Sequence, residues 1–157
     1  MSDERLHRDR LVAEAVDRVG SDDFGEPTWQ EGLDLLLEGL RSEARLHELG
    51  VEIAAGEVVN QLANRLGIVE WRHRHPEIAA VGIRGPIVIV GQPRTGTTIL
   101  HDLLALDHSL RAPLTWEVDR PLPPPETATY DTDPRIADVD ATLALSDSLI
   151  PGFTRFH

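Results

Sequence analysis

The sequence predicts an α/β fold: a helical N-terminal segment over residues 1–80, then the start of a P-loop-like parallel-sheet domain over residues 81–157. Two observations predict it. Apolar residues recur at helical spacing through the first half of the chain. In the second half, a β-branched run at residues 86–90 precedes a glycine-bearing loop and a further helical pattern, which is the order of a βα unit.

Three helical patterns are expected in the N-terminal segment. Each carries a stripe of Leu, Val, Ile or Ala and is closed by glycine or proline, which favour helix ends. Thr28 and Glu31 have the spacing of a capping box, which favours a helix start. The helices are expected to run from residue 4 to Gly20, from Thr28 to Gly50, and through residues 54–69 to Pro76. We interpret their stripes as helix packing rather than cofactor binding.

The second half changes from helical to strand-like spacing. Residues 86–90 are apolar at every position and are typical of a buried parallel strand, and residues 110–116 are the candidate for a second, shorter strand. The proline-rich residues 121–125 can form neither a helix nor a central strand, so they are expected to be an extended connector. Asp133 followed by Pro134 predicts the start of a last helix.

One strand with one candidate partner does not complete a sheet. A buried parallel strand needs neighbours on both edges, and parallel pairs need crossovers of a dozen or more residues. We therefore expect the chain to be the N-terminal part of a larger domain, incomplete and inactive alone. Its unfinished sheet edge would favour self-association.

Composition excludes several classes of function. The net charge of −12 argues against binding of nucleic acid or anionic membranes, because both need a basic surface. The chain has no cysteine, which excludes disulfides and thiolate metal sites. All 15 basic residues are arginine, which excludes Schiff-base chemistry and a lysine-bearing P-loop. No signal peptide or membrane span is evident and no convincing metal cluster is present, so we expect a cytoplasmic protein without a metal.

The loop at residues 91–98 is the strongest chemical signal. Gly91 and Gly96 allow the chain to wrap tightly, and a helix that opens near Gly96 presents unpaired N–H groups and the positive end of its dipole. Arg94 adds the only cation of the loop. The predicted phosphate-binding residues are Gln92, Pro93, Arg94, Thr95, Gly96, Thr97 and Thr98.

The spacing of the two glycines is that of a Walker A loop, but Thr97 stands where that loop requires lysine. ATP or GTP hydrolysis is therefore disfavoured. An atypical P-loop nucleotide kinase or NTPase and a non-catalytic helical interaction module remain as alternative functions.

Residues 93–98, Pro-Arg-Thr-Gly-Thr-Thr after an apolar run, resemble the 5′-phosphosulfate loop of sulfotransferases. The bacterial sulfotransferase family 3 type is the most similar branch, since residues 110–117, the proline-rich connector and residues 133–136 resemble it too. The resemblance implies transfer of a sulfuryl group from 3′-phosphoadenosine 5′-phosphosulfate, PAPS, to a hydroxyl or amine of a small-molecule acceptor. It implies no metal cofactor.

The resemblance also implies two catalytic residues. Arg94 is suited to the sulfonate and the leaving phosphate, because its planar guanidinium can bind two oxygens at once. Several similar enzymes use a glutamate somewhat over 20 residues past the loop as the base, and Glu117 lies 23 positions after Arg94. The alternative for Glu117 is a surface or helix-capping carboxylate.

Overall fold

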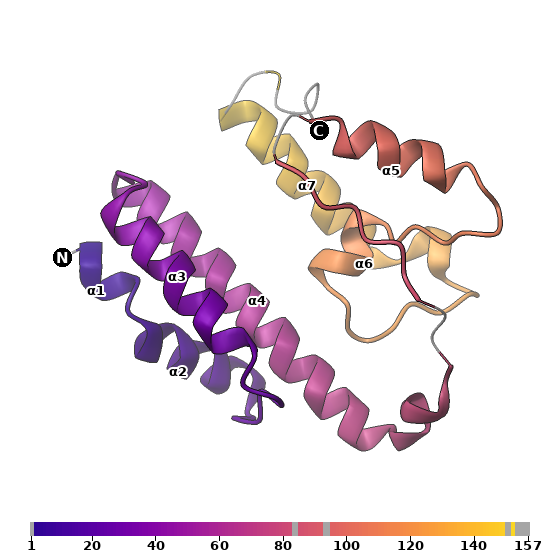
Figure 1. The fold of residues 1–157 in the computed structure, drawn as a ribbon, viewed down its shortest axis with the longest axis horizontal. Helices are drawn as coiled ribbons and strands as arrows, with labels where there is room; N and C mark the ends of the chain where they lie inside the picture. Colours follow the sequence, from indigo (N-terminus) through magenta and orange to yellow (C-terminus); the bar gives the residue numbers. More distant parts are fainter. Residues whose placement is uncertain (1, 83–84, 93–94, 150–151, 153–157) are drawn as a thin grey trace. The chain divides into compact units, whose positions relative to one another are not determined.

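The computed structural model describes residues 2–82, 85–92, 95–149 and 152 of the chain. The chain divides into two compact units, Met1–Val81 and Gly82–His157, and each is described here by itself. The described residues of both units form helices, turns and irregular segments, and none of them forms a strand (Figure 1).

The first unit is a bundle arranged along one long helix. Its elements are α1 (Ser2–Arg5), α2 (Arg8–Val19), α3 (Trp29–Ser42), α4 (Glu48–Arg74) and the 3-10 helix η1 (Pro76–Ala80). Helix α2 packs along α4, and α1 and α3 lie against this pair (Figure 1). The stripes of α2, α3 and α4 meet in a single apolar core, and each fully buried Leu or Val there stabilises the unit by about 1.5–3 kcal/mol. The core consists of Leu6, Leu11, Ala15, Phe24, Leu33, Leu37, Val51, Val58, Val59, Leu62 and Leu66.

The expected helices of this unit are found with changed boundaries. Helix α2 ends at Gly20, which takes a left-handed conformation with φ +76°, as the sequence predicts. Helix α3 begins directly after Thr28, but the Thr28 side chain makes no capping hydrogen bond. Helix α3 ends at Ser42 rather than at the expected Gly50, which lies inside α4. The reason is that His47 caps α4: its Nδ1 accepts a 3.1 Å hydrogen bond from the Gly50 N–H.

The second unit contains α5 (Thr97–Ala105), α6 (Thr115–Asp119), the 3-10 helix η2 (Tyr130–Thr132) and α7 (Pro134–Leu149). Helices α6 and α7 are in contact. Helix α7 starts at Pro134 as predicted, with the Asp133 carboxylate accepting a 3.0 Å hydrogen bond from the Arg135 N–H. Among the described residues of this unit, only Trp116 and Glu117 are buried.

The predicted α/β fold is wrong for this structure. Residues 86–90 form neither helix nor strand, and Val88 and Val90 are 72% and 89% exposed. Residues 110–114 are also irregular, and the rest of the second candidate strand is the first turn of α6. The physical reason is that an apolar run becomes a strand only where another strand offers hydrogen-bond partners. No described segment of the chain offers them, and the fold is helical.

Candidate functional site

The loop after residues 86–90 wraps closely onto the start of α5. A Cβ added to Gly91 would lie 2.8 Å from Cγ2 of Thr97 and 3.0 Å from Oγ1 of Thr95, so the main chain at residue 91 passes where no side chain fits. The Thr95 hydroxyl donates a 2.6 Å hydrogen bond to the Gln92 carbonyl oxygen. The wrap predicted from the glycine spacing is therefore present in the described part of the loop.

Helix α5 opens at Gly96, which has φ +88°, a left-handed conformation that favours glycine. The Gly96 carbonyl accepts the first helical hydrogen bond, 3.0 Å from the Leu100 nitrogen. Gly96 has no side chain to cap this end of the helix, and among the described residues no other side chain accepts a hydrogen bond from the first N–H groups of α5. Apart from the half-buried Thr97, the described loop residues are exposed. An anion could reach N–H groups and the positive dipole end here.

The structure brings five of the predicted phosphate ligands into this one loop. They are Gln92, Thr95, Gly96, Thr97 and Thr98. Pro93 and Arg94 lie outside the described residues, and the phosphate-binding role of all seven residues remains a prediction. None of the hydrogen bonds or ion pairs among the described residues joins the loop to Glu117.

Glu117 is a buried carboxylate in the first turn of α6, only 7% exposed. Its Oε2 accepts two hydrogen bonds, from the Leu114 N–H at 2.7 Å and from the Tyr130 hydroxyl at 2.9 Å. Its Oε1 is paired with the guanidinium of Arg111. The Leu114 contact makes Glu117 part of the cap of α6, which was the expected alternative to a catalytic base.

The pKa of Glu117 is the result of opposed effects. Burial raises the pKa, but the hydrogen bonds from Leu114 and Tyr130 and the charge of Arg111 outweigh burial and hold it below the ordinary glutamate value. Glu117 is therefore ionised at neutral pH. It can accept a proton, although its lowered pKa makes it a weaker base than an unperturbed carboxylate.

A second polar cluster lies beside Glu117, and the sequence analysis assigned its side chains no role in a site. Arg135 forms a bidentate pair with Asp133 at 2.8 and 2.6 Å and donates to the carbonyl oxygens of Arg120 and Pro123, both at 2.7 Å. Its guanidinium also lies 4.7 Å from the ring centroid of Trp116. Arg135 thus ties the proline-rich connector and the start of α7 to α6.

The bidentate contact lowers the pKa of Asp133 to about 2. The sequence predicted the location of Asp133 correctly, since Asp133 before Pro134 indicates a helix start. The side-chain pair and the stacking on Trp116 depend on how residues 116–135 fold back, which residue spacing does not reveal.

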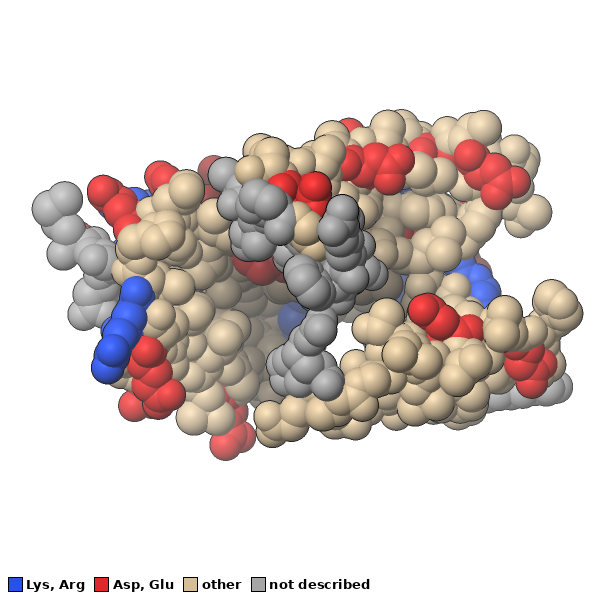
Figure 2. All heavy atoms as spheres, turned by 90° about the horizontal axis from the view of Figure 1, so that it is seen from above, with Lys and Arg blue, Asp and Glu red and all other residues tan. Residues whose placement is uncertain are grey.

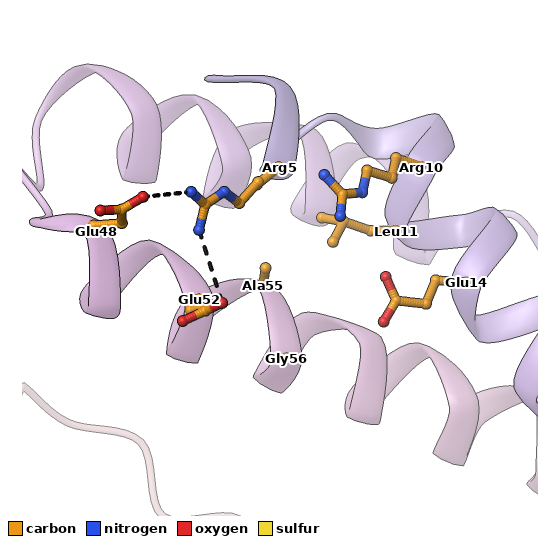
Figure 3. A pocket seen from close by; sticks show the side chains of 8 residues that line it. All are labelled: Arg5, Arg10, Leu11, Glu14, Glu48, Glu52, Ala55 and Gly56. Atoms are coloured by element: carbon orange, nitrogen blue, oxygen red, sulfur yellow. Dashed lines mark hydrogen bonds and ion pairs between the residues drawn. The ribbon is translucent and has the colours of Figure 1, made fainter. Parts of the chain in front are cut away.

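The first unit has a hollow of its own, of about 510 Å³, between α1, α2 and α4 (Figure 3). Its lining residues are Arg5, Arg10, Leu11, Glu14, Glu48, Glu52, Ala55 and Gly56. Arg5 is neutralised by Glu48 at 2.8 Å and Glu52 at 3.9 Å, while Arg10 and Glu14 add one charge of each sign. Acidic groups outnumber cations in this hollow, so it does not favour phosphate.

Charge on the molecular surface agrees with the composition. On the face seen in Figure 2, acidic side chains occupy more of the surface than basic ones, and no broad basic patch is visible. Among the described helices, none is both long and apolar enough to cross a membrane. The described residues also contain no group of three or more His, Asp or Glu side chains arranged to hold a metal ion.

Comparison with known proteins gives consistent matches. Residues 86–150 match the model of the Sulfotransferase family. The solved sulfotransferase STF1 from Mycobacterium tuberculosis H37Rv is 33% identical, with a TM-score of 0.73 over 93% of this chain and 40% of that one. Sulfotransferase STF9 from Mycobacterium avium is 29% identical, with a TM-score of 0.71 over 95% of this chain and 37% of that one. This chain thus spans about 40% of the length of these structures. No curated protein matches it significantly.

Proposed function

We propose, from the premise that the chain belongs to the sulfotransferase family through residues 86–150, that the protein moves a sulfuryl group from PAPS to a small-molecule acceptor. The acceptor group is a hydroxyl or an amine. Similarity to the two mycobacterial sulfotransferase structures supports transferase activity.

The observation that carries the proposal is the uncapped start of α5. Gly96 holds the turn at φ +88°, and among the described residues no side chain bonds to the adjacent N–H groups. A phosphate or phosphosulfate bound there would supply the missing acceptors, and each charge-assisted hydrogen bond would contribute about 1.5–3 kcal/mol. The loop therefore suits the 5′ end of the donor despite the acidic surface around it.

In the proposed reaction, the acceptor oxygen or nitrogen attacks sulfur as the bond from sulfur to the 5′-phosphate oxygen breaks. Adenosine 3′,5′-bisphosphate leaves with the bonding electrons, and the acceptor loses its proton. Arg94 is proposed to bind the sulfonate and the leaving phosphate, whose charge grows as the bond breaks. Glu117 is proposed as the base, because it is ionised at neutral pH.

Because we expect this chain to be inactive alone, the test is run on an enzyme that contains it as the N-terminal part, and the variants described below are measured in that same enzyme. The assay is transfer of radioactive sulfur from PAPS to a panel of hydroxyl and amine acceptors, run beside hydrolysis of Mg-ATP. We expect labelled sulfate ester or sulfamate, matching release of adenosine 3′,5′-bisphosphate, and no ATP hydrolysis. Hydrolysis of ATP without sulfuryl transfer would favour an NTPase instead. Absence of both sulfuryl transfer and ATP hydrolysis would favour a non-catalytic module.

A further inference from the structure

Two oxygens of the same carboxylate have different surroundings at Glu117. Oε2 accepts from the Leu114 main chain at 2.7 Å and from the Tyr130 hydroxyl at 2.9 Å, so two hydrogen bonds hold it. Oε1 has Arg111 as its partner. The Glu117 side chain is 5% exposed, whereas that of Arg111 is 66% exposed. Oε1 is therefore covered by a side chain that is itself largely exposed to solvent.

Tyr130 is itself held in place. It begins the short helix η2, which follows a turn closed by the Thr129 N–H donating to the Glu126 carbonyl at 3.1 Å. Its ring packs against Trp116, with the ring centroids 5.3 Å apart. Trp116 is buried and is covered in turn by Arg135. The Tyr130 hydroxyl thus reaches Glu117 from a braced position.

We propose that Tyr130 is a positioning residue of the proposed active site: its hydroxyl fixes Oε2 of Glu117, which leaves Oε1, beneath Arg111, as the oxygen that takes the acceptor's proton. The inference rests on the proposed function. Displacement of the Arg111 guanidinium by the acceptor would free Oε1 without breaking either bond to Oε2.

The groups that act on this carboxylate from other elements are Arg111, which precedes α6, and Tyr130, on η2. Arg135, on α7, has its pKa raised mainly by its hydrogen bond to Asp133 and less by the charge of Glu117. The Tyr130 pKa is raised by its hydrogen bond to Glu117, which agrees with a hydroxyl that keeps its proton and donates it.

The decisive variant is Tyr130→Phe, which removes the hydroxyl and keeps the ring on Trp116. The matched control is Thr132→Val, which removes a hydroxyl of the same short helix that donates to the Thr129 carbonyl rather than to Glu117. The first readout is the titration of the Glu117 side-chain carboxyl carbon by NMR, which does not depend on activity. We expect Tyr130→Phe to move the titration to higher pH and Thr132→Val to leave it in place.

The second readout is sulfuryl transfer. We expect Tyr130→Phe to lower kcat about tenfold at unchanged KM and to move the acidic limb of the pH profile upward. An unchanged titration would overturn the contact, and an unchanged kcat beside an active wild type would overturn the positioning role. A wild type that transfers no sulfuryl group would instead remove the proposed function, and with it the role of Oε1.

A third readout keeps the test valid if Tyr130→Phe does not fold. Tyr130 is the only tyrosine in the sequence, so 3-fluorotyrosine labels this ring alone. Its fluorine resonance should titrate with the same midpoint as the Glu117 carboxyl carbon. A fluorine signal that does not follow that midpoint would show that the hydroxyl and the carboxylate are not coupled.

Discussion

Gly91 and Thr97 approach so closely that a Cβ on residue 91 would stand 2.8 Å from Cγ2 of Thr97. Real Cβ atoms essentially never make so short a contact. The obstacle is a methyl group on the half-buried Thr97, at the first position of α5. The loop that is proposed to hold the donor's phosphate therefore depends on the absence of a side chain at residue 91, six positions before Thr97.

The first prediction follows from this contact. Gly91→Ala should displace the loop and weaken binding of adenosine 3′,5′-bisphosphate by about tenfold, a loss of about 1.4 kcal/mol, measured by calorimetry. Gly91→Ala combined with Thr97→Ser should recover part of the affinity, because serine lacks the obstructing methyl group. Equal weakness of the single and double variants would show that the clash is not the cause.

The second prediction separates backbone strain from ligand binding. Gly96 and Gly20 have φ values of +88° and +76°, and a Cβ on either would meet no atom within 4 Å. Alanine at either position should therefore cost about 1–2 kcal/mol of strain in its own unit. Only Gly96→Ala should weaken adenosine 3′,5′-bisphosphate binding in calorimetry, since Gly20 ends α2 in the first unit. Equal affinities in the two variants would place the ligand elsewhere.

Local sequence signals predicted the helix ends better than the β structure. Gly20 and Pro134 were identified correctly because a left-handed glycine and an N-terminal proline act through their own backbones. Residues 86–90 were assigned wrongly because strand formation depends on a partner, which no short window contains. Gly50 failed as a helix end because the cap of α4 is a histidine side chain, an unusual N-cap residue.

In the candidate site, too, local features could be predicted from the sequence and long-range contacts could not. The wrap of the loop at Gly91 follows from glycine spacing alone. The surroundings of Glu117 do not, because Tyr130 reaches it from 13 residues away and Arg111 from 6. Long-range hydrogen bonds of this kind set a carboxylate's protonation and orientation, and they leave no periodic trace in the sequence.

The third prediction concerns Arg135, which holds together the polar interior of the second unit. Arg135→Ala should lower the thermal midpoint of that unit and broaden the indole N–H signal of Trp116 in NMR spectra. Arg120→Ala is the matched control, since Arg120 pairs with Asp138 and both side chains are about half exposed. Such a surface pair contributes only about 0–1 kcal/mol. Equal shifts of the thermal midpoint in the two variants would show that Arg135 does not hold the polar interior together.

The fourth prediction is a dependence on acidity. The pKa of Asp133 is lowered to about 2, so the folded state binds a proton less readily than the unfolded chain. The stabilisation is therefore complete above the ordinary aspartate pKa of about 3.9 and is lost as the pH falls through about 2. Thermal unfolding of the second unit between pH 5 and pH 2 should show this loss in the wild type, whereas Asp133→Asn should be less stable at pH 5 and less sensitive to acid.

The last prediction tests the proposed chemistry at Arg94, the only cation in the sequence of residues 91–98. Arg94→Ala should lower kcat by about 10²–10³-fold, because charge on the leaving phosphate grows in the transition state and would go uncompensated. Arg94→Lys should keep part of the activity, since lysine supplies the charge without the planar fork. Arg74→Ala is the control, because Arg74 forms an exposed helical pair with Glu70. Full activity in Arg94→Ala, measured by transfer of labelled sulfate, would exclude a catalytic role for this arginine.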